Sequence, residues 1–270
     1  MAITEQQPWV KHYQPGVPAE IDYPTTSLVE MLEHAVAEAG DAPALEFFGR
    51  RTSYAELGAQ IDRAAEGLRL LGVRAGDRVA LILPNCPQHV VAFYAVLRLG
   101  GIVVEHNPLY TSPELRHQFE DHQARIVIAW DKVAPTVRAF PADIEIDHIV
   151  SVNLLQAFPT IKRLALYLPV KSLRESRAAL TGSAAGTTPW KDLFSHGAID
   201  PTHPRPAIQD LAAIQYTSGT TCRPKGAMLT HYNLHCNALQ GEAWMHGAEY
   251  RKEVFYAILP MFHSFGLRST

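Results

Sequence analysis

The sequence predicts an α/β fold in which open, mainly parallel β-sheets are flanked by helices. Residues 78–83, 102–104 and 125–130 form short apolar runs with the length of buried strands. Segments with apolar residues at helical spacing separate these runs, and strands that alternate with helices favour a parallel sheet. The chain has 270 residues, of which 47% are hydrophobic and 19% are charged, the balance of an ordinary globular protein.

Capping boxes mark the first two helices. In each box a serine and a glutamate three residues later satisfy each other's backbone amides, and the boxes are Ser27–Glu30 and Ser53–Glu56. Gly40 and Gly72 stand where the helical spacing of each segment stops, as glycine commonly does at a helix end. A β-hairpin that turns at Gly49 is expected between the two helices.

Further helices and strands follow in alternation. Asn85 is expected to cap a helix that reaches Gly100, and Ser112 opens the next helix, with proline at its first position. Residues 147–152 predict another buried strand, and residues 254–259 predict one near the end of the chain.

Composition argues against several classes of protein. The net charge of −3 and pI of about 6.5 imply no nucleic-acid partner. Cys86, Cys222 and Cys236 have neither the spacing of a metal site nor an even number for disulfides, which favours a reducing, cytoplasmic setting. Residues 1–24 are polar, are broken by prolines and lack the pattern of a signal peptide. We expect them to form an extended arm.

The stretch from Tyr216 to Gly226 lies between two short apolar runs and concentrates hydroxyl side chains, glycine and lysine. Glycine lets the backbone approach a ligand, exposed backbone amides attract anions, and lysine suits phosphate. These features predict a loop that grips a polyphosphate. It is not a Walker A motif, because lysine precedes glycine and Pro224 would disturb a following helix. Composition alone leaves open a surface turn rich in Ser, Thr and Gly.

The run Tyr-Thr-Ser-Gly-Thr-Thr-x-x-Pro-Lys-Gly that starts at Tyr216 resembles the signature of the adenylate-forming, or AMP-binding, superfamily. Cys222 departs from that signature, because the family has Gly or, less often, Ser there. Other pieces resemble the same family in the expected order: residues 53–57, 76–80, 83–85 and 107–111.

The resemblance implies that residues 25–270 are an incomplete N-terminal domain of such an enzyme, with a subdomain break near residues 200–210. The chain stops at Thr270, before the family's adenine and ribose contacts and before its small C-terminal domain. The fragment alone is therefore expected to be inactive. An alternative class stays open, namely a non-catalytic nucleotide-binding remnant or an interaction module.

The resemblance also implies a two-step reaction. A carboxylate attacks the α-phosphate of Mg-ATP to give an acyl-adenylate and pyrophosphate, and the thiol of coenzyme A then displaces AMP. Thr217 would help to hold Mg²⁺, and Lys225 and His263 would be catalytic, with His263 beside the acyl group. The implied nucleotide-binding residues are Thr217, Ser218, Gly219, Thr220, Thr221, Lys225 and Gly226.

Two segments resemble the branch of medium- and long-chain fatty acyl-CoA ligases most. They are residues 262–266, which contain a second family motif, and the basic, apolar residues 161–180. A basic amphipathic stretch can lie on a membrane surface, which here would be the inner face of the membrane. Pro169 divides this stretch, and a solvated basic face packed on its own domain is the alternative interpretation.

Overall fold

The structure is a computed structural model that describes residues 7–217, 224–245, 247–249 and 251–263. Within these residues one sheet has the strand order β7-β6-β5-β3-β4-β8-β9, and every neighbouring pair is parallel except β8 with β9. The strands are β3 (Arg78–Ile82), β4 (Ile102–Glu105), β5 (Ile126–Trp130), β6 (His148–Val152), β7 (Thr188–Pro189), β8 (Leu211–Thr217) and β9 (Lys225–Thr230). The predicted open, mainly parallel sheet is confirmed.

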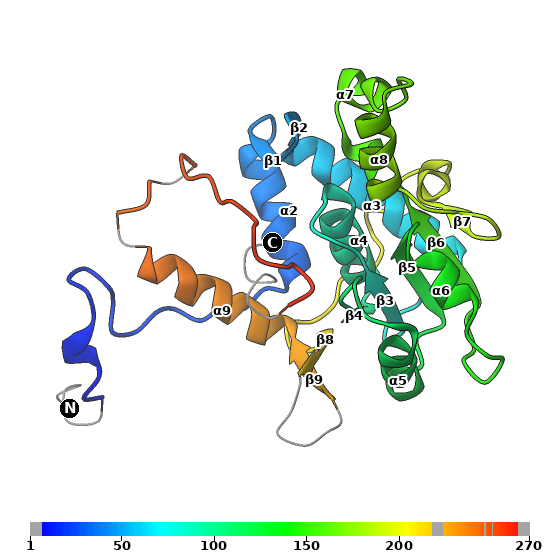
Figure 1. Cartoon of the computed structure of the whole chain (residues 1–270). Coiled ribbons are helices and arrows are strands. Elements are labelled where there is room, and N and C mark those ends of the chain that lie inside the picture. Colours follow the sequence, from blue (N-terminus) through cyan, green and yellow to red (C-terminus); the bar gives the residue numbers. More distant parts are fainter. Residues whose placement is uncertain (1–6, 218–223, 246, 250, 264–270) are drawn as a thin grey trace.

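Helices cover both faces of the sheet (Figure 1). Side chains alternate along β3, so Val79 and Leu81 pack with α2, α3 and α4, whereas Ala80 and Ile82 pack with α5 and α6. The helices are α2 (Leu28–Ala39), α3 (Tyr54–Leu70), α4 (Pro87–Arg98), α5 (Ser112–His122), α6 (Ala134–Arg138), α7 (Thr160–Ala165), α8 (Lys171–Leu180) and α9 (His231–Trp244), with short 3₁₀ turns at Val10–His12, Leu154–Ala157 and Trp190–Phe194.

Local signals set the ends of the first helices as predicted. The Ser53 amide donates to Glu56 Oε2 (3.0 Å) and the Glu56 amide donates to Ser53 Oγ (3.2 Å), and an equivalent box precedes α2. Between these helices, β1 (Pro43–Phe47) and β2 (Arg50–Ser53) form a separate antiparallel hairpin. Gly49, at the turn of that hairpin, has a φ of 92°, which glycine adopts at no steric cost.

Three predictions of local structure are wrong. Residues 254–259 form no strand within the described chain; they are exposed throughout, because no sheet edge pairs with them. Asn85 does not cap α4, whose N-cap is Cys86, because the Asn85 side chain binds the backbone of residues 257–261 instead. Proline is the second residue of α5, since the helix begins one residue earlier, behind a capping box at Thr111.

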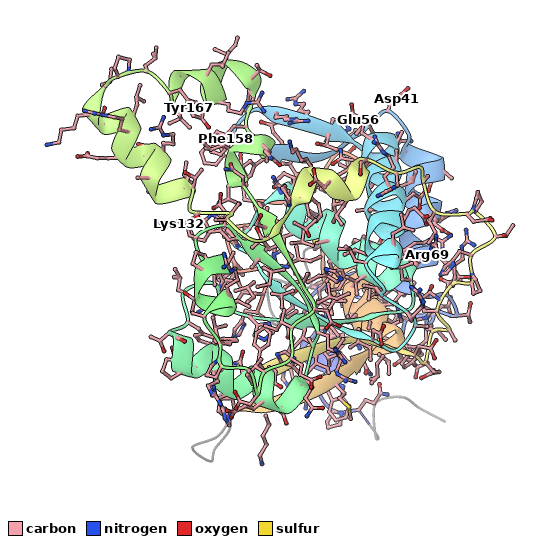
Figure 2. All side chains as sticks on the ribbon, turned by 90° about the vertical axis from the view of Figure 1, so that its right-hand side faces the viewer. Asp41, Glu56, Arg69, Lys132, Phe158 and Tyr167 are labelled. Atoms are coloured by element: carbon pink, nitrogen blue, oxygen red, sulfur yellow. The ribbon has the colours of Figure 1, made fainter. Side chains whose placement is uncertain are left out.

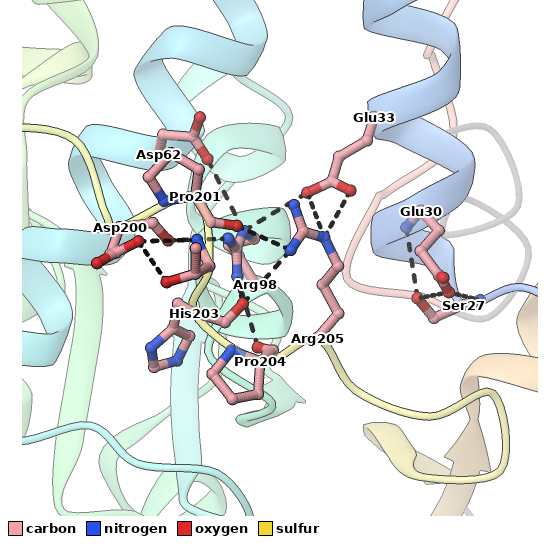
Figure 3. A network of polar contacts seen from close by, with 11 residues as sticks. Ser27, Glu30, Glu33, Asp62, Arg98, Asp200, Pro201, His203, Pro204 and Arg205 are labelled. Atoms are coloured by element: carbon pink, nitrogen blue, oxygen red, sulfur yellow. Dashed lines mark hydrogen bonds and ion pairs between the residues drawn. The ribbon is translucent and has the colours of Figure 1, made fainter.

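Arg98, at the end of α4, fastens the connector that precedes β8 (Figure 3). Its side chain is only 3% exposed, and its guanidinium donates to the carbonyl of His203 at 3.1 Å. Its Nε lies 3.6 Å from Glu33 Oε1 and 3.9 Å from Asp62 Oδ1. Arg205 pairs with the same Glu33 carboxylate at 2.8 Å. The chain is therefore held against α2, α3 and α4 immediately before it enters β8.

The pair α7 and α8 projects from the body of the molecule (Figure 1). Pro169 lies between the two helices, so the predicted break is confirmed. No residue of either helix is buried. Among the described residues, the helices are all too short or too polar to span a membrane.

Candidate functional site

The predicted phosphate loop joins two antiparallel strands at the carboxyl edge of the sheet, where β3, β4 and β8 end. Thr217 is the last residue of β8 and Lys225 the first of β9, and the two face each other in the ladder. Both are exposed. In α/β proteins ligands bind outside the carboxyl ends of the parallel strands, so this hairpin presents a hydroxyl and an ammonium group at the expected edge. Ser218, Gly219, Thr220, Thr221 and the departure Cys222 lie outside the described residues.

Gly226 has a packing role in the stem of this hairpin. It lies opposite Tyr216 in the ladder, and a Cβ atom added to it would approach Ile214 Cγ2 to 2.8 Å. A distance of that size requires a neighbouring atom to move, so a larger residue would force the Ile214 side chain or strand β9 to shift. The glycine therefore allows the two strands that carry Thr217 and Lys225 to pack closely.

Tyr216 anchors the same stem to α5. Its hydroxyl donates to Asp121 Oδ2 at 2.6 Å, and burial together with this carboxylate raises the pKa of Tyr216 above its ordinary value. Its ring lies near the imidazoles of His106 and His122. Sequence reasoning missed Asp121, because no local pattern indicates which helix residue meets a strand 95 positions away.

A buried imidazole pair lies beneath Tyr216. The Ala124 amide donates to His122 Nδ1, so the His122 proton sits on Nε2 and is donated to His106 Nε2 at 2.9 Å. His106 Nδ1 in turn donates to the carbonyl of Val104 at 2.9 Å. Burial lowers the pKa of His106 to about 4 and holds the pKa of His122 well below its ordinary value. Both imidazoles are thus neutral at pH 7.

A second buried pair joins α4 to the end of β4. His89 Nε2 lies 2.9 Å from Glu105 Oε1, and both side chains are at most 1% exposed. Burial opposes a charged imidazole, but the Glu105 carboxylate outweighs it and the pKa of His89 is raised. Gln215 faces Glu105 in the ladder, and its buried amide has no hydrogen-bond partner within the described chain. Strand β8, which leads into the loop, therefore lies next to buried polar side chains.

Asn85 holds the segment that precedes His263. Its Nδ2 donates to the carbonyls of Ala257 (2.7 Å) and Leu259 (2.8 Å), and its Oδ1 accepts from the Met261 amide (2.9 Å). Met261 is buried in the core cluster, and the exposed His263 follows two residues later. Because Asn85 follows β3, this arrangement holds residues 257–261 beside the carboxyl end of β3, two residues before His263.

A large cavity lies at the opposite, amino edge of the sheet. It has a volume of about 1460 Å³ and is lined by residues that precede β3, β4 and β8. Its charged lining residues already bind one another or their neighbours, as Arg69 does Glu66 (2.7 Å) and Arg205 does Glu33 (2.8 Å). Size alone therefore does not make this cavity the functional site.

A bound Mg²⁺ is compatible with the carboxyl edge. Mg²⁺ prefers oxygen ligands and usually binds through substrate phosphates, waters and one or two protein groups. The exposed hydroxyl of Thr217 fits that requirement. Within the described part of the chain no group of three His, Cys, Asp or Glu side chains could hold a metal ion, and a cation carried by a triphosphate needs no such group.

Nearly the whole chain is similar to known proteins. A family model described as "AMP-binding enzyme" matches residues 32–270. A long-chain-fatty-acid–CoA ligase of Bacillus subtilis is 33% identical over 270 residues, which is 98% of this chain and 47% of the relative. One of Salmonella typhimurium is 34% identical over 96% of this chain and 46% of its own length. The present chain thus spans about half the length of these relatives.

The fold is also similar to that of a solved ligase structure. The crystal structure of a long-chain-fatty-acid-CoA ligase from Archaeoglobus fulgidus superposes with a TM-score of 0.70 at 25% identity, covering 95% of this chain and 47% of that protein. The sheet and its flanking helices therefore correspond to part of a larger enzyme of that kind.

Proposed function

Because this chain belongs to the family of AMP-binding enzymes, we propose that it is part of an enzyme that activates a carboxylic acid with ATP. A carboxylate oxygen forms a bond to the α-phosphorus as the bond to pyrophosphate breaks, which gives an acyl-adenylate. The sulfur of coenzyme A then attacks the acyl carbon, and AMP leaves. We propose a medium- or long-chain fatty acid as the substrate, and the names of the relatives support the long-chain end of this range.

One observation carries this proposal. Thr217 and Lys225 are exposed and paired at the mouth of the β8–β9 hairpin, at the carboxyl edge of the parallel sheet. Lys225 would neutralise charge on the β- and γ-phosphates, and catalysis of this kind depends mainly on positioning and electrostatic stabilisation. The proposed nucleotide-binding residues are Thr217, Ser218, Gly219, Thr220, Thr221, Lys225 and Gly226.

The other proposed roles follow from the same edge. Mg²⁺, when bound with ATP, neutralises charge on the phosphates, and the Thr217 hydroxyl would contact it. His263 would line the acyl end of the site, supported by the three hydrogen bonds through which Asn85 holds residues 257–261. We propose that residues 25–270 belong to the catalytic domain, that residues 1–24 form an arm, and that any subdomain boundary falls near residues 200–210.

We also propose a cytoplasmic enzyme that contacts the inner face of the membrane through residues 161–180. The relatives named above use a substrate that partitions into lipid, and the helices α7 and α8 in this range are exposed. The contact would let the enzyme take its acid from the bilayer.

Nucleotide binding and acid activation test the proposal separately. Titration calorimetry with Mg-ATP on this chain should show binding that Lys225→Ala weakens by about tenfold to a hundredfold, the usual cost of one charged hydrogen bond. Lys191→Ala, an exposed lysine outside the site, is the matched control. Equal affinities for both variants would contradict the role of Lys225.

ATP–pyrophosphate exchange identifies the acid. It is measured on a protein in which this chain is extended to the full length of its relatives. Exchange should require a fatty acid, increase with chain length and fall in the Lys225→Ala variant. ATP binding without exchange for any carboxylic acid would refute the ligase assignment and identify a non-catalytic nucleotide-binding protein.

A further inference from the structure

The helix pair α7–α8 exposes apolar side chains that a soluble surface seldom presents together. Ile161 is 84% exposed and Leu164 is 62% exposed, and they lie on one face of α7 because they are three residues apart. Tyr167, Leu168 and Val170, which connect the helices, are each about half exposed. In Figure 2, Tyr167 lies in this projecting end of the molecule. The helix pair therefore has a large apolar surface with no covering element among the described residues.

A distant part of the chain extends this apolar surface. Phe48, at the turn of the β1–β2 hairpin, is 56% exposed and stacks on Phe158 with ring centroids 4.5 Å apart. Lys162 Nζ donates to the carbonyl of Phe48 at 2.7 Å, which fixes the hairpin turn beside α7. The lipid-facing surface, as we name it, consists of Phe48, Ile161, Leu164, Tyr167, Leu168 and Val170.

Basic residues are concentrated in the segment that supplies most of the lipid-facing surface. Residues 160–180 contain five Lys or Arg residues and one acidic residue, a net charge of +4 in a chain whose total is −3. The rest of the chain is therefore acidic, and positive charge is concentrated where apolar side chains are exposed. Arg177 lies over the ring of Tyr167 at 4.8 Å, so its guanidinium is next to the apolar surface.

We propose that the lipid-facing surface docks onto a bilayer that contains anionic phospholipids. The apolar side chains would enter the boundary between headgroups and acyl chains, and the basic side chains would bind lipid phosphates. Charge complementarity explains the need for anionic lipid, and the exposed aliphatic residues explain why a bilayer suits the surface better than a soluble polyanion. This docking rests on the membrane contact in the proposed function, for which it specifies the lipid and the contact residues. It does not depend on the ligase reaction.

Vesicle flotation with this chain tests the proposal. Binding should be strong to vesicles of phosphatidylglycerol and phosphatidylcholine, weak to phosphatidylcholine alone, and reduced by salt. The variant Arg163→Gln/Lys171→Gln/Arg174→Gln should lower partitioning by about a hundredfold, given the contribution of each basic residue near an anionic surface. Ile161→Ser/Leu164→Ser should lower it by about tenfold or more.

Matched control variants distinguish an effect of the lipid-facing surface from an effect of the net charge of the chain. Lys11→Gln/Lys191→Gln/Arg251→Gln removes the same charge from exposed positions elsewhere and should leave partitioning unchanged. Equal losses in both triple variants, or equal binding to neutral vesicles, would refute the proposal. The chain could instead bind heparin but not vesicles, with Ile161→Ser/Leu164→Ser leaving heparin binding unchanged. That result would refute docking onto a bilayer and assign the surface to a soluble polyanion. Lys225→Ala should leave partitioning unchanged, so a failure of nucleotide binding and a failure of docking can be distinguished.

Discussion

At the amino edge of the parallel sheet, charged side chains bind one another and backbone carbonyls. At the carboxyl edge, buried imidazoles and amides support side chains that stay exposed. Arg98 and Arg205 share Glu33 and fix the connector at the first edge, beside the cavity of about 1460 Å³. Thr217 and Lys225 are exposed at the second edge, where the cavity that the described residues Tyr216 and Gly226 help to line has a volume of only about 330 Å³. The site that we propose in this fold therefore follows the position of the strand ends and not the volume of a cavity.

The largest expected effect of a single substitution is at the amino edge. Arg98→Ala should lower the free energy of unfolding by about 3–5 kcal/mol, because it removes the hydrogen bonds that the buried guanidinium donates to carbonyls of the connector and its ion pairs with the half-exposed Glu33 and Asp62. Urea unfolding monitored by circular dichroism would measure the change. Arg51→Ala, which removes an exposed pair with Glu46, is the matched control and should cost about 1 kcal/mol or less. Similar losses in the two variants would mean that the Arg98 network does not fasten the connector.

The two edges should also respond differently to pH. A guanidinium stays charged across the acidic range, whereas the buried His106 must take up a proton. Its pKa is lowered to about 4 by burial, so the unfolded chain binds that proton first. Stability is present above the ordinary pKa of about 6.5 and is lost as pH falls toward 4, by about 3 kcal/mol for His106 alone. His122 adds to this loss, since its pKa is also lowered.

Unfolding free energies measured between pH 7 and pH 4 check the sign, with His106→Gln expected to flatten the slope. His34→Gln is the control, because His34 is exposed. The His89–Glu105 pair acts in the opposite direction, since a raised pKa gives stability that is lost as pH rises through it. An unchanged slope in His106→Gln would show that the pKa of this imidazole is not lowered in the folded protein.

The carboxyl edge can be loosened without changing the loop itself. Asn85→Ala removes three hydrogen bonds to residues 257–261, which is worth about 2–3 kcal/mol of local stability. Hydrogen exchange at the Met261 amide should accelerate by about 30-fold to a hundredfold. Asn85→Asp keeps the acceptor for that amide and should have a smaller effect. Asn107→Ala, which removes one turn contact to Leu109, should leave this exchange rate unchanged.

Much of the architecture could be predicted from local patterns. The capping boxes at Ser27 and Ser53 and the apolar runs of β3, β5 and β8 act over a few residues, and each was identified correctly. Residues 254–259 show the limit of this approach. Their apolar run satisfies the composition of a strand, but a strand also needs a neighbouring edge, and Asn85 binds this backbone from 172 positions away.

The candidate site also has one part that local sequence patterns predict and one part that they do not. A local motif indicated the loop, and the structure locates its two described ends at Thr217 and Lys225. The supports of that loop could not be found in this way. Asp121, Glu105 and His89 meet β8 or its neighbour only after helix packing and strand register are established. Their residue types alone are equally typical of an exposed helix face or a solvated strand end.

The smallest expected effect concerns Cys222, which lies outside the described residues. The family signature that this loop resembles has Gly or, less often, Ser there, and Gly at such a position indicates either positive φ or close approach to the ligand. A side chain forced into the left-handed region costs about 1–2 kcal/mol, although Cys is nearly the size of the tolerated Ser. In a chain extended to the full length of its relatives, Cys222→Gly should therefore tighten Mg-ATP binding by several-fold in titration calorimetry, where about 1.4 kcal/mol corresponds to a factor of ten. Cys222→Ser is the matched variant: a gain with Gly alone would indicate a backbone requirement, and equal dissociation constants in all three proteins would show that the loop accepts Cys.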